Sequence, residues 1–136
     1  MKESANITVE NSDGIPKVRR EAGDDGESFE VAVLISQGFG AGWSTWNREH
    51  SAILLFHKDI VEFVSENPVE TCVDAQVWEE KLESLVMELV GDDYVYTGGA
   101  ESLGVVWLPE GMPFTVTEYD GAESLRTLAS YEWDRA

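Results

Sequence analysis

The sequence contains a single cysteine, Cys72, so the chain cannot close a disulfide within itself. It has only two histidines and four prolines, and no apolar run that approaches membrane-spanning length. The first residues do not follow the basic-then-apolar pattern of a signal peptide. These absences exclude a disulfide-stapled secreted domain and a membrane span. We therefore expect a protein of the reducing cytoplasm.

Basic residues are scarce as well. Nine lysines and arginines stand against 27 aspartates and glutamates, which gives a net charge of −18, far beyond the magnitude of about 2–8 that keeps a small domain in solution. Residues 59–136 alone hold 18 acidic and three basic residues. DNA, RNA and anionic membranes are negatively charged and bind basic surfaces, so they are poor partners for this acidic chain. A protein with a basic surface is the partner that the charge favours, and the oligomeric state stays open.

The length of 136 residues fits one domain of ordinary size. Residues 1–28 are polar and contain the turn signals 11–14 and 23–26. We predict a flexible N-terminal arm over 1–28 that folding does not require, followed by a single α+β domain over 29–136. The arm's basic cluster is Lys17, Arg19 and Arg20, read either as a contact arm or as a solvated tail against acidic surface.

The apolar residues follow strand-like patterns in several segments. Residues 31–35 (VAVLI) suit a strand covered on both faces, and 51–56 suits a buried strand or the start of a helix. The other expected strands are 94–96, 103–108 and 114–119, with 109–113 as a hairpin-like connection between the last two.

Two helices are expected between these strands. Asp59 is placed to cap a short helix that stops at Asn67-Pro68. Thr71 and Asp74 resemble a capping box for a long amphipathic helix, which buries Trp78 and ends at Gly91. The prediction is an α+β fold with a small, mainly antiparallel sheet packed by one long and one short helix.

The outer surface of the long helix is acidic. We predict a contact site for a basic, nucleic-acid-binding protein at Glu79, Glu80, Glu83, Glu88, Asp92 and Asp93. Duplex DNA presents one charge per roughly 1.7 Å of axis, so a nucleic-acid mimic must recruit acids from 59–70 or 92–101 as well. The alternative is an ordinary solvated helix face.

Residues 36–47 (SQGFGAGWSTWN) combine glycines with costly aromatic residues. Backbone N–H groups of such a loop could cradle an anion between tryptophan walls, or the glycines could allow a tight crossing while the tryptophans fill the core. We expect one of Trp43 and Trp46 to be buried and the other accessible. The candidate ligand residues are Gly38, Phe39, Gly40, Gly42, Trp43, Ser44, Thr45 and Trp46.

Other chemical patterns are incomplete. Trp43 stands where a dinucleotide-binding G-x-G-x-x-G needs its third glycine. His50 and His57, with Asp59 nearby, lack a recognised metal-ligand pattern, and Cys72 lacks a histidine partner. Neighbouring carboxylates occur by chance in an acidic chain, as in Asp92-Asp93 and Glu118 with Asp120. We predict no catalytic residue, metal site or cofactor.

Four segments together resemble a family of small uncharacterised bacteriophage proteins: 40–46 (GAGWSTW), 96–99 (YTGG), 107–111 (WLPEG) and 118–124 (EYDGAES). The resemblance covers residues 29–136. It implies a bacteriophage origin and no catalytic residues.

The functional expectation joins the charge to this resemblance. We expect a non-enzymatic acidic protein of the host cytoplasm that inhibits a nucleic-acid-binding host protein, in the manner of small acidic phage proteins that block host defence. The alternative is a small-molecule or nucleotide-binding protein, or an enzyme, that uses the Gly38–Asn47 loop.

Overall fold

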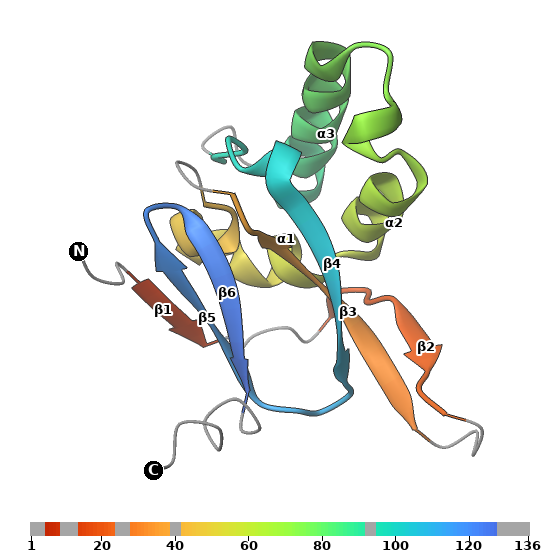
Figure 1. The fold of residues 1–136 in the computed structure, drawn as a ribbon, viewed down its shortest axis with the longest axis vertical. Helices are drawn as coiled ribbons and strands as arrows, with labels where there is room; N and C mark the ends of the chain where they lie inside the picture. The colour runs from red at the N-terminus through yellow and green to blue at the C-terminus, as the bar shows by residue number, and fades with distance from the viewer. Residues whose placement is uncertain (1–4, 9–13, 24–27, 39–41, 92–94, 128–136) are drawn as a thin grey trace.

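The computed structural model describes residues 5–8, 14–23, 28–38, 42–91 and 95–127 (Figure 1). Its strands form two three-stranded antiparallel sheets with the orders β1-β5-β6 and β2-β3-β4. The strands are β1 (Ala5–Thr8), β2 (Arg19–Glu21), β3 (Phe29–Ser36), β4 (Leu103–Pro109), β5 (Phe114–Tyr119) and β6 (Ala122–Thr127). The predicted α+β class is confirmed, and the strands are divided between two sheets.

Three α-helices pack against these sheets: α1 (Ser51–Phe56), α2 (Lys58–Glu66) and α3 (Ala75–Val90). Segment 51–56 is therefore helical. Single 3₁₀ turns occur at Ser44–Trp46, Arg48–His50, Val69–Thr71 and Ala100–Ser102. In Figure 1, α2 and α3 lie together at one end of the long axis, while β2 lies toward the other end.

The helix starts differ from the predicted ones. α2 is capped by His57, whose Nδ1 accepts a hydrogen bond from the Asp59 amide at 3.1 Å. Asp74, and not Thr71, is the N-cap of α3, and its carboxylate accepts from the amides of Gln76 and Val77. A carboxylate one residue before a helix satisfies the first amides directly, which leaves Thr71 in the preceding 3₁₀ turn. The predicted end is confirmed, since Gly91 has the left-handed φ of 74°.

The N-terminal segment contributes one strand to each sheet, within the residues 1–28 that the sequence predicts as a flexible arm. β1 pairs with β5, so that Ile7 lies opposite Val116, and β2 pairs with β3. Ile15 and Val18 also pack against the buried clusters. The segment is polar because edge strands gain order from backbone hydrogen bonds and need few apolar side chains.

The connection over 109–113 is not a hairpin, which corrects another prediction. It carries the chain from β4 in one sheet to β5 in the other. The hairpin joins β5 to β6 through Asp120 and Gly121, whose φ values of 53° and 89° are the positive angles that a two-residue type I′ turn requires. No strand forms at Val95 or Tyr96, and Tyr94 lies outside the described residues.

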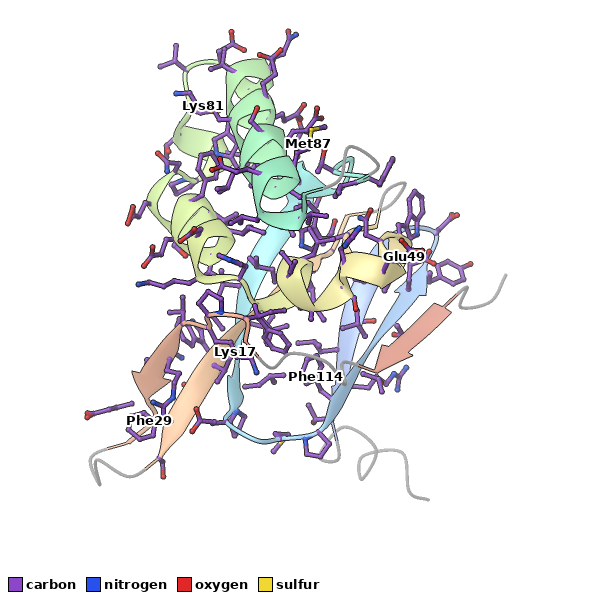
Figure 2. The ribbon with its side chains drawn as sticks, turned by 180° about the vertical axis from the view of Figure 1, so that it is seen from behind. Lys17, Phe29, Glu49, Lys81, Met87 and Phe114 are labelled. Atoms are coloured by element: carbon purple, nitrogen blue, oxygen red, sulfur yellow. The ribbon has the colours of Figure 1, made fainter. Side chains whose placement is uncertain are left out.

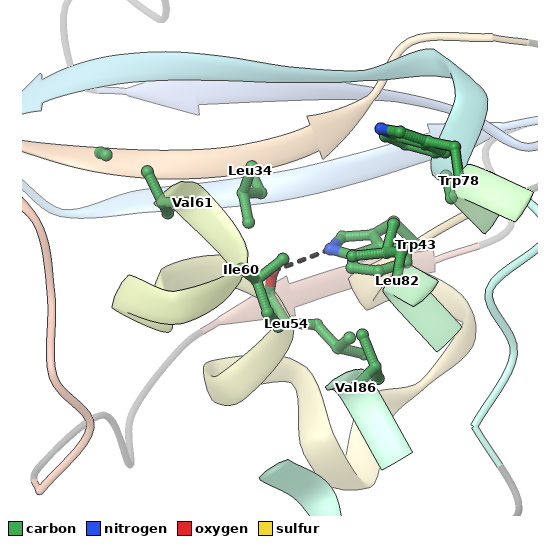
Figure 3. Packing of buried hydrophobic residues seen from close by; sticks show 10 residues of the cluster. Leu34, Trp43, Leu54, Ile60, Val61, Trp78, Leu82 and Val86 are labelled. Atoms are coloured by element: carbon green, nitrogen blue, oxygen red, sulfur yellow. Dashed lines mark hydrogen bonds between the residues drawn. The ribbon is translucent and has the colours of Figure 1, made fainter. Parts of the chain in front are cut away.

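β3 is buried on both faces, as its apolar run predicted. Ala32 and Leu34 belong to one buried cluster with residues of α1, α2 and α3, while Val31, Val33 and Ile35 belong to a second with Val116. Figure 3 shows the first cluster, where Trp43 lies among Leu54, Ile60 and Leu82. The Trp43 Nε1 donates to the Leu54 carbonyl at 2.8 Å. The loop after β3 is thereby anchored in the core between the sheet and the helices.

Candidate functional site

The glutamates of α3 are distributed around the helix. Successive residues of an α-helix are about 100° apart, so Glu79 and Glu83 lie on one flank, where they line a surface hollow of about 330 Å³ with Tyr96, Thr97 and Gly98. Thr97 Oγ1 donates to Glu83 at 3.3 Å. Glu80 and Glu88 instead line a shallow hollow with Lys81 and Ser84. Asp92 and Asp93 lie outside the described residues.

Glu101, in the 3₁₀ turn before β4, joins the flank of Glu79. A hydrogen bond between the two carboxyl groups raises the pKa of Glu79 above its ordinary value, and burial and the charge of Glu101 add to the rise. The pair therefore concentrates negative charge, and a cation placed there would relieve it. Glu101 lies within the range 92–101 from which the predicted acidic surface had to recruit.

We use the name acidic helix pair for α2 and α3 with the acid-rich segments beside them. Residues 58–101 hold twelve acidic and two basic residues, a net charge of −10. The described carboxylates of this region are Asp59, Glu62, Glu66, Asp74, Glu79, Glu80, Glu83, Glu88 and Glu101. One of the two lysines, Lys58, already faces Glu62 at 3.9 Å. Acidic side chains therefore occur on α2, around α3 and in the turn that contains Glu101.

The basic cluster of the N-terminal segment lies against the β2-β3-β4 sheet. Arg19 donates to both oxygens of Glu110 and stacks on Phe29, with its guanidinium carbon 4.2 Å from the ring centre. Arg20 donates to Glu30 at 2.9 Å and stacks on Trp107 at 4.1 Å. The Nζ of Lys17, whose side chain is labelled in Figure 2, lies 4.5 Å from the centre of the Phe56 ring. Arg19 and Arg20 are thus paired with carboxylates of the β2-β3-β4 sheet and its following turn.

The glycine-containing loop binds a carboxylate of its own chain. Glu123, only 3% exposed, accepts hydrogen bonds from the amides of Ser36, Trp43 and Thr45 at 2.8–3.0 Å and from the Thr45 hydroxyl at 2.6 Å. Two of the loop N–H groups expected to cradle an external anion, those of Trp43 and Thr45, are therefore already paired with Glu123. Phe39 and Gly40 lie outside the described residues.

Trp43 and Trp46 have different environments, as predicted. Trp43 is 0% exposed and Trp46 is 42% exposed. The ring of Trp46 lies against Gly42, where a Cβ would come within 2.6 Å of it, and against Tyr96 at a centroid distance of 5.1 Å. Gly42 is thus needed for the close approach of this ring. Gly38 and Ser44 complete the described loop, and the buried Ser44 Oγ has no hydrogen-bond partner among the described residues.

Asn47 joins this loop to the segment after α3. Its side-chain amide donates to the carbonyls of Trp43 and Tyr96, and its Oδ1 accepts from the Tyr96 amide at 2.7 Å. The amide therefore replaces a strand partner at Tyr96, where a strand was predicted. This bond pattern places the Trp46–Tyr96 ring pair beside the hollow of Glu79 and Glu83.

Sequence reasoning missed the role of two buried carboxylates. Glu118 lies directly opposite Glu123 in the β5–β6 ladder, and its carboxylate accepts from the Gly121 amide at 2.6 Å. The sequence suggests Glu118 and Asp120 as neighbouring carboxylates, but Asp120 is exposed in the turn. The available signal was Asp120-Gly121, because a two-residue turn at this dipeptide sets Glu118 across from Glu123.

The remaining chemical patterns do not converge. Among the described residues no group of three or more His, Cys, Asp or Glu side chains is placed to hold a metal ion. The Cys72 thiol contacts the Val69 carbonyl at 2.9 Å. No helix in the described ranges is both long and apolar enough to cross a bilayer.

The chain was compared with models of protein families, with curated proteins and with solved structures, and none of the three comparisons produced a match.

Proposed function

We propose that this protein is a non-enzymatic binding protein that covers a basic, nucleic-acid-binding surface of a host protein with its acidic helix pair. The observation that carries the proposal is the separation of charge. Arg19 and Arg20 form ion pairs near β2, whereas residues 58–101 hold a net charge of −10 with two lysines. A surface of this kind speeds association with a basic partner and repels nucleic acid itself.

The bacteriophage setting belongs to the same proposal. The resemblance of residues 29–136 to small phage proteins supports a partner in the host cytoplasm, and a defence protein that binds nucleic acid has the required basic surface. The partner would be inhibited because the acidic helix pair occupies the surface that nucleic acid needs.

Ligand binding in the Gly38–Asn47 loop has less support. Glu123 already accepts hydrogen bonds from the loop amides of Trp43 and Thr45, and Trp43 is buried. An anionic ligand there would have to displace a carboxylate held by four hydrogen bonds. Trp43 and Trp46 were the predicted aromatic walls of such a site, and only Trp46 of these two is accessible to solvent.

A charge-reversal capture experiment tests the proposed function. The tagged protein is used as bait in a bacterial lysate, and the recovered proteins are quantified for bait carrying Glu80→Lys and Glu83→Lys. The matched control carries Glu21→Lys and Glu49→Lys, which are also exposed and give the same net charge. We expect basic nucleic-acid-binding proteins to be lost with the first pair and retained with the second. Equal recovery with both baits, at low and high salt, would contradict the proposal.

A further inference from the structure

The end of the acidic helix pair contains a pocket whose walls are largely apolar. It lies between α2, the Val69–Thr71 turn and the start of α3, and its volume is about 390 Å³, within the range of ligand sites in proteins. Phe63 and Trp78 meet in its wall, with ring centroids 5.6 Å apart. Val73 at the rim is fully exposed and Val77 is 43% exposed.

The pocket walls are held in place by hydrogen bonds. The Trp78 Nε1 donates to the Asn67 carbonyl at 2.6 Å, and the Thr71 hydroxyl donates to the Pro68 carbonyl at 2.8 Å. Asp74 caps α3 at the rim. Because the shape is already fixed, an occupant would not have to order these walls on binding.

The charge around the pocket identifies the occupant. Glu66 and Asp74 are exposed at the rim, with one lysine, Lys81, and the surrounding region carries a net charge of −10. A second copy of the chain would bring another −18 to this surface and be repelled. A lysine- or arginine-rich segment with an apolar side chain fits this pocket, because its cations can contact the acidic rim while its apolar side chain contacts the walls.

We propose that this pocket receives an apolar side chain from a basic segment of the partner, while the flanking lysines or arginines of that segment contact Glu66, Asp74 and neighbouring carboxylates. This inference rests on the proposed function and adds an anchoring site to it. Charge supplies the attraction, and the pocket supplies selectivity for segments that combine basic and apolar residues.

Cys72 allows the pocket to be monitored directly. It is the single cysteine of the chain, it lines the pocket and it is half-buried. The rate at which a thiol reagent modifies the protein is therefore a single-site measure of pocket occupancy.

The test uses three defined peptides. The first is a lysine-rich helical peptide with two leucines one helical turn apart, the second has alanine at both leucine positions, and the third keeps the leucines but has glutamine for lysine. Dissociation constants are measured by fluorescence anisotropy, and Cys72 modification is measured with and without each peptide. We expect the first peptide to bind at least about tenfold more tightly than the alanine peptide, as burial of one leucine side chain implies. It should also bind at least about tenfold more tightly than the glutamine peptide, and it should slow the modification of Cys72.

Two variants locate the effect. Val73→Ser with Val77→Ser removes the exposed apolar rim without touching the core, and it should abolish the preference for leucine over alanine. Tyr119→Ser is the matched control, because it removes another exposed apolar side chain, 40% exposed, from β5. The control should keep the preference unchanged.

The outcomes separate the two proposals. If both lysine peptides bind equally in a salt-sensitive manner and neither changes the rate of Cys72 modification, the pocket proposal fails. The proposed function of the acidic helix pair would then stand without it. If no lysine peptide binds even at low salt, both proposals fail. If the glutamine peptide binds as tightly as the lysine peptide, or if the protein dimerises in sedimentation runs unless Val73 and Val77 are replaced, the basic occupant is wrong.

Discussion

At the scale of single residues, Glu123 connects β6 to the end of β3 and to the loop that follows β3. Its carboxylate is the acceptor for three buried amides and one hydroxyl of the 36–45 stretch. A buried N–H or O–H donor that loses its acceptor destabilises the folded state by its full desolvation penalty. Glu123 therefore has a structural role, and the loop's shape depends on β6, which is about 80 residues away in the sequence.

Replacement of Glu123 by alanine should lower the free energy of unfolding by about 3 kcal/mol or more, because several buried donors lose a charged acceptor together. Urea denaturation followed by tryptophan fluorescence measures this loss. Glu110→Ala is the control: it breaks an exposed ion pair with Arg19 and should cost less than about 1 kcal/mol. Similar losses for the two variants would show that Glu123 is not the loop's anchor.

Glu79 makes stability depend on pH in a defined direction. Its folded-state pKa is raised by Glu101, so the folded protein binds this proton more readily than the unfolded chain, and the stabilising contribution present in acid is lost as the pH rises through the folded pKa. Glu79→Gln keeps a neutral partner for Glu101. We expect the variant to be more stable than the original at pH 7.

This advantage of Glu79→Gln should shrink as the pH falls from 7 toward the ordinary value of 4.5. Thermal melts across that range measure it, with Glu80→Gln as the control for removal of one charge from α3. A difference between Glu79→Gln and the original protein that does not change with pH would contradict the shared carboxyl pair.

At the scale of elements, the N-terminal segment contributes to both sheets. β1 extends the β5–β6 hairpin to three strands, β2 pairs with β3, and the Val18 carbonyl accepts from the Ala32 amide at 3.0 Å. Two-stranded antiparallel units are marginal in water, and a third strand is a large fraction of their stability.

Deletion of residues 1–21 should therefore lower the melting temperature by about 4 °C or more, as expected when 1 kcal/mol or more is lost from a domain of this size. Deletion of residues 1–8, which removes β1 alone, should give a smaller decrease, since Ile15 and Val18 keep their contacts with the buried clusters. Differential scanning calorimetry of both truncations measures the two decreases. An unchanged melting temperature after the longer deletion would show that folding does not require the N-terminal segment, as the sequence predicted.

At the scale of the whole molecule, the net charge of −18 opposes compaction. Raising the salt concentration from about 0.01 M to 0.15 M shortens the screening length from about 30 Å to 8 Å. We expect the free energy of unfolding to rise over this range. In the variant carrying Glu80→Lys and Glu83→Lys the net charge falls to −14, so the rise should be smaller. A stability that does not depend on salt would show that the acidic helix pair carries little mutual repulsion.

The local patterns of the chain were sufficient for features that depend on periodicity. The apolar run of β3 predicted burial on both faces, the spacing around Trp78 predicted the long helix, and Gly91 predicted its end, because each depends on neighbours within one or two turns. The excess of acidic residues and the contrast between Trp43 and Trp46 were also evident.

Contacts between distant segments required the folded structure. No local rule assigns Glu123 to the amides of the 36–45 stretch, pairs Glu79 with Glu101, or divides β4 and β5 between two sheets. These arrangements depend on which buried donors find an acceptor after the chain has closed its long loops. The same closure brings Phe63 and Trp78 together, so the pocket of the acidic helix pair is a property of the packed helices, although its charge is a property of the composition.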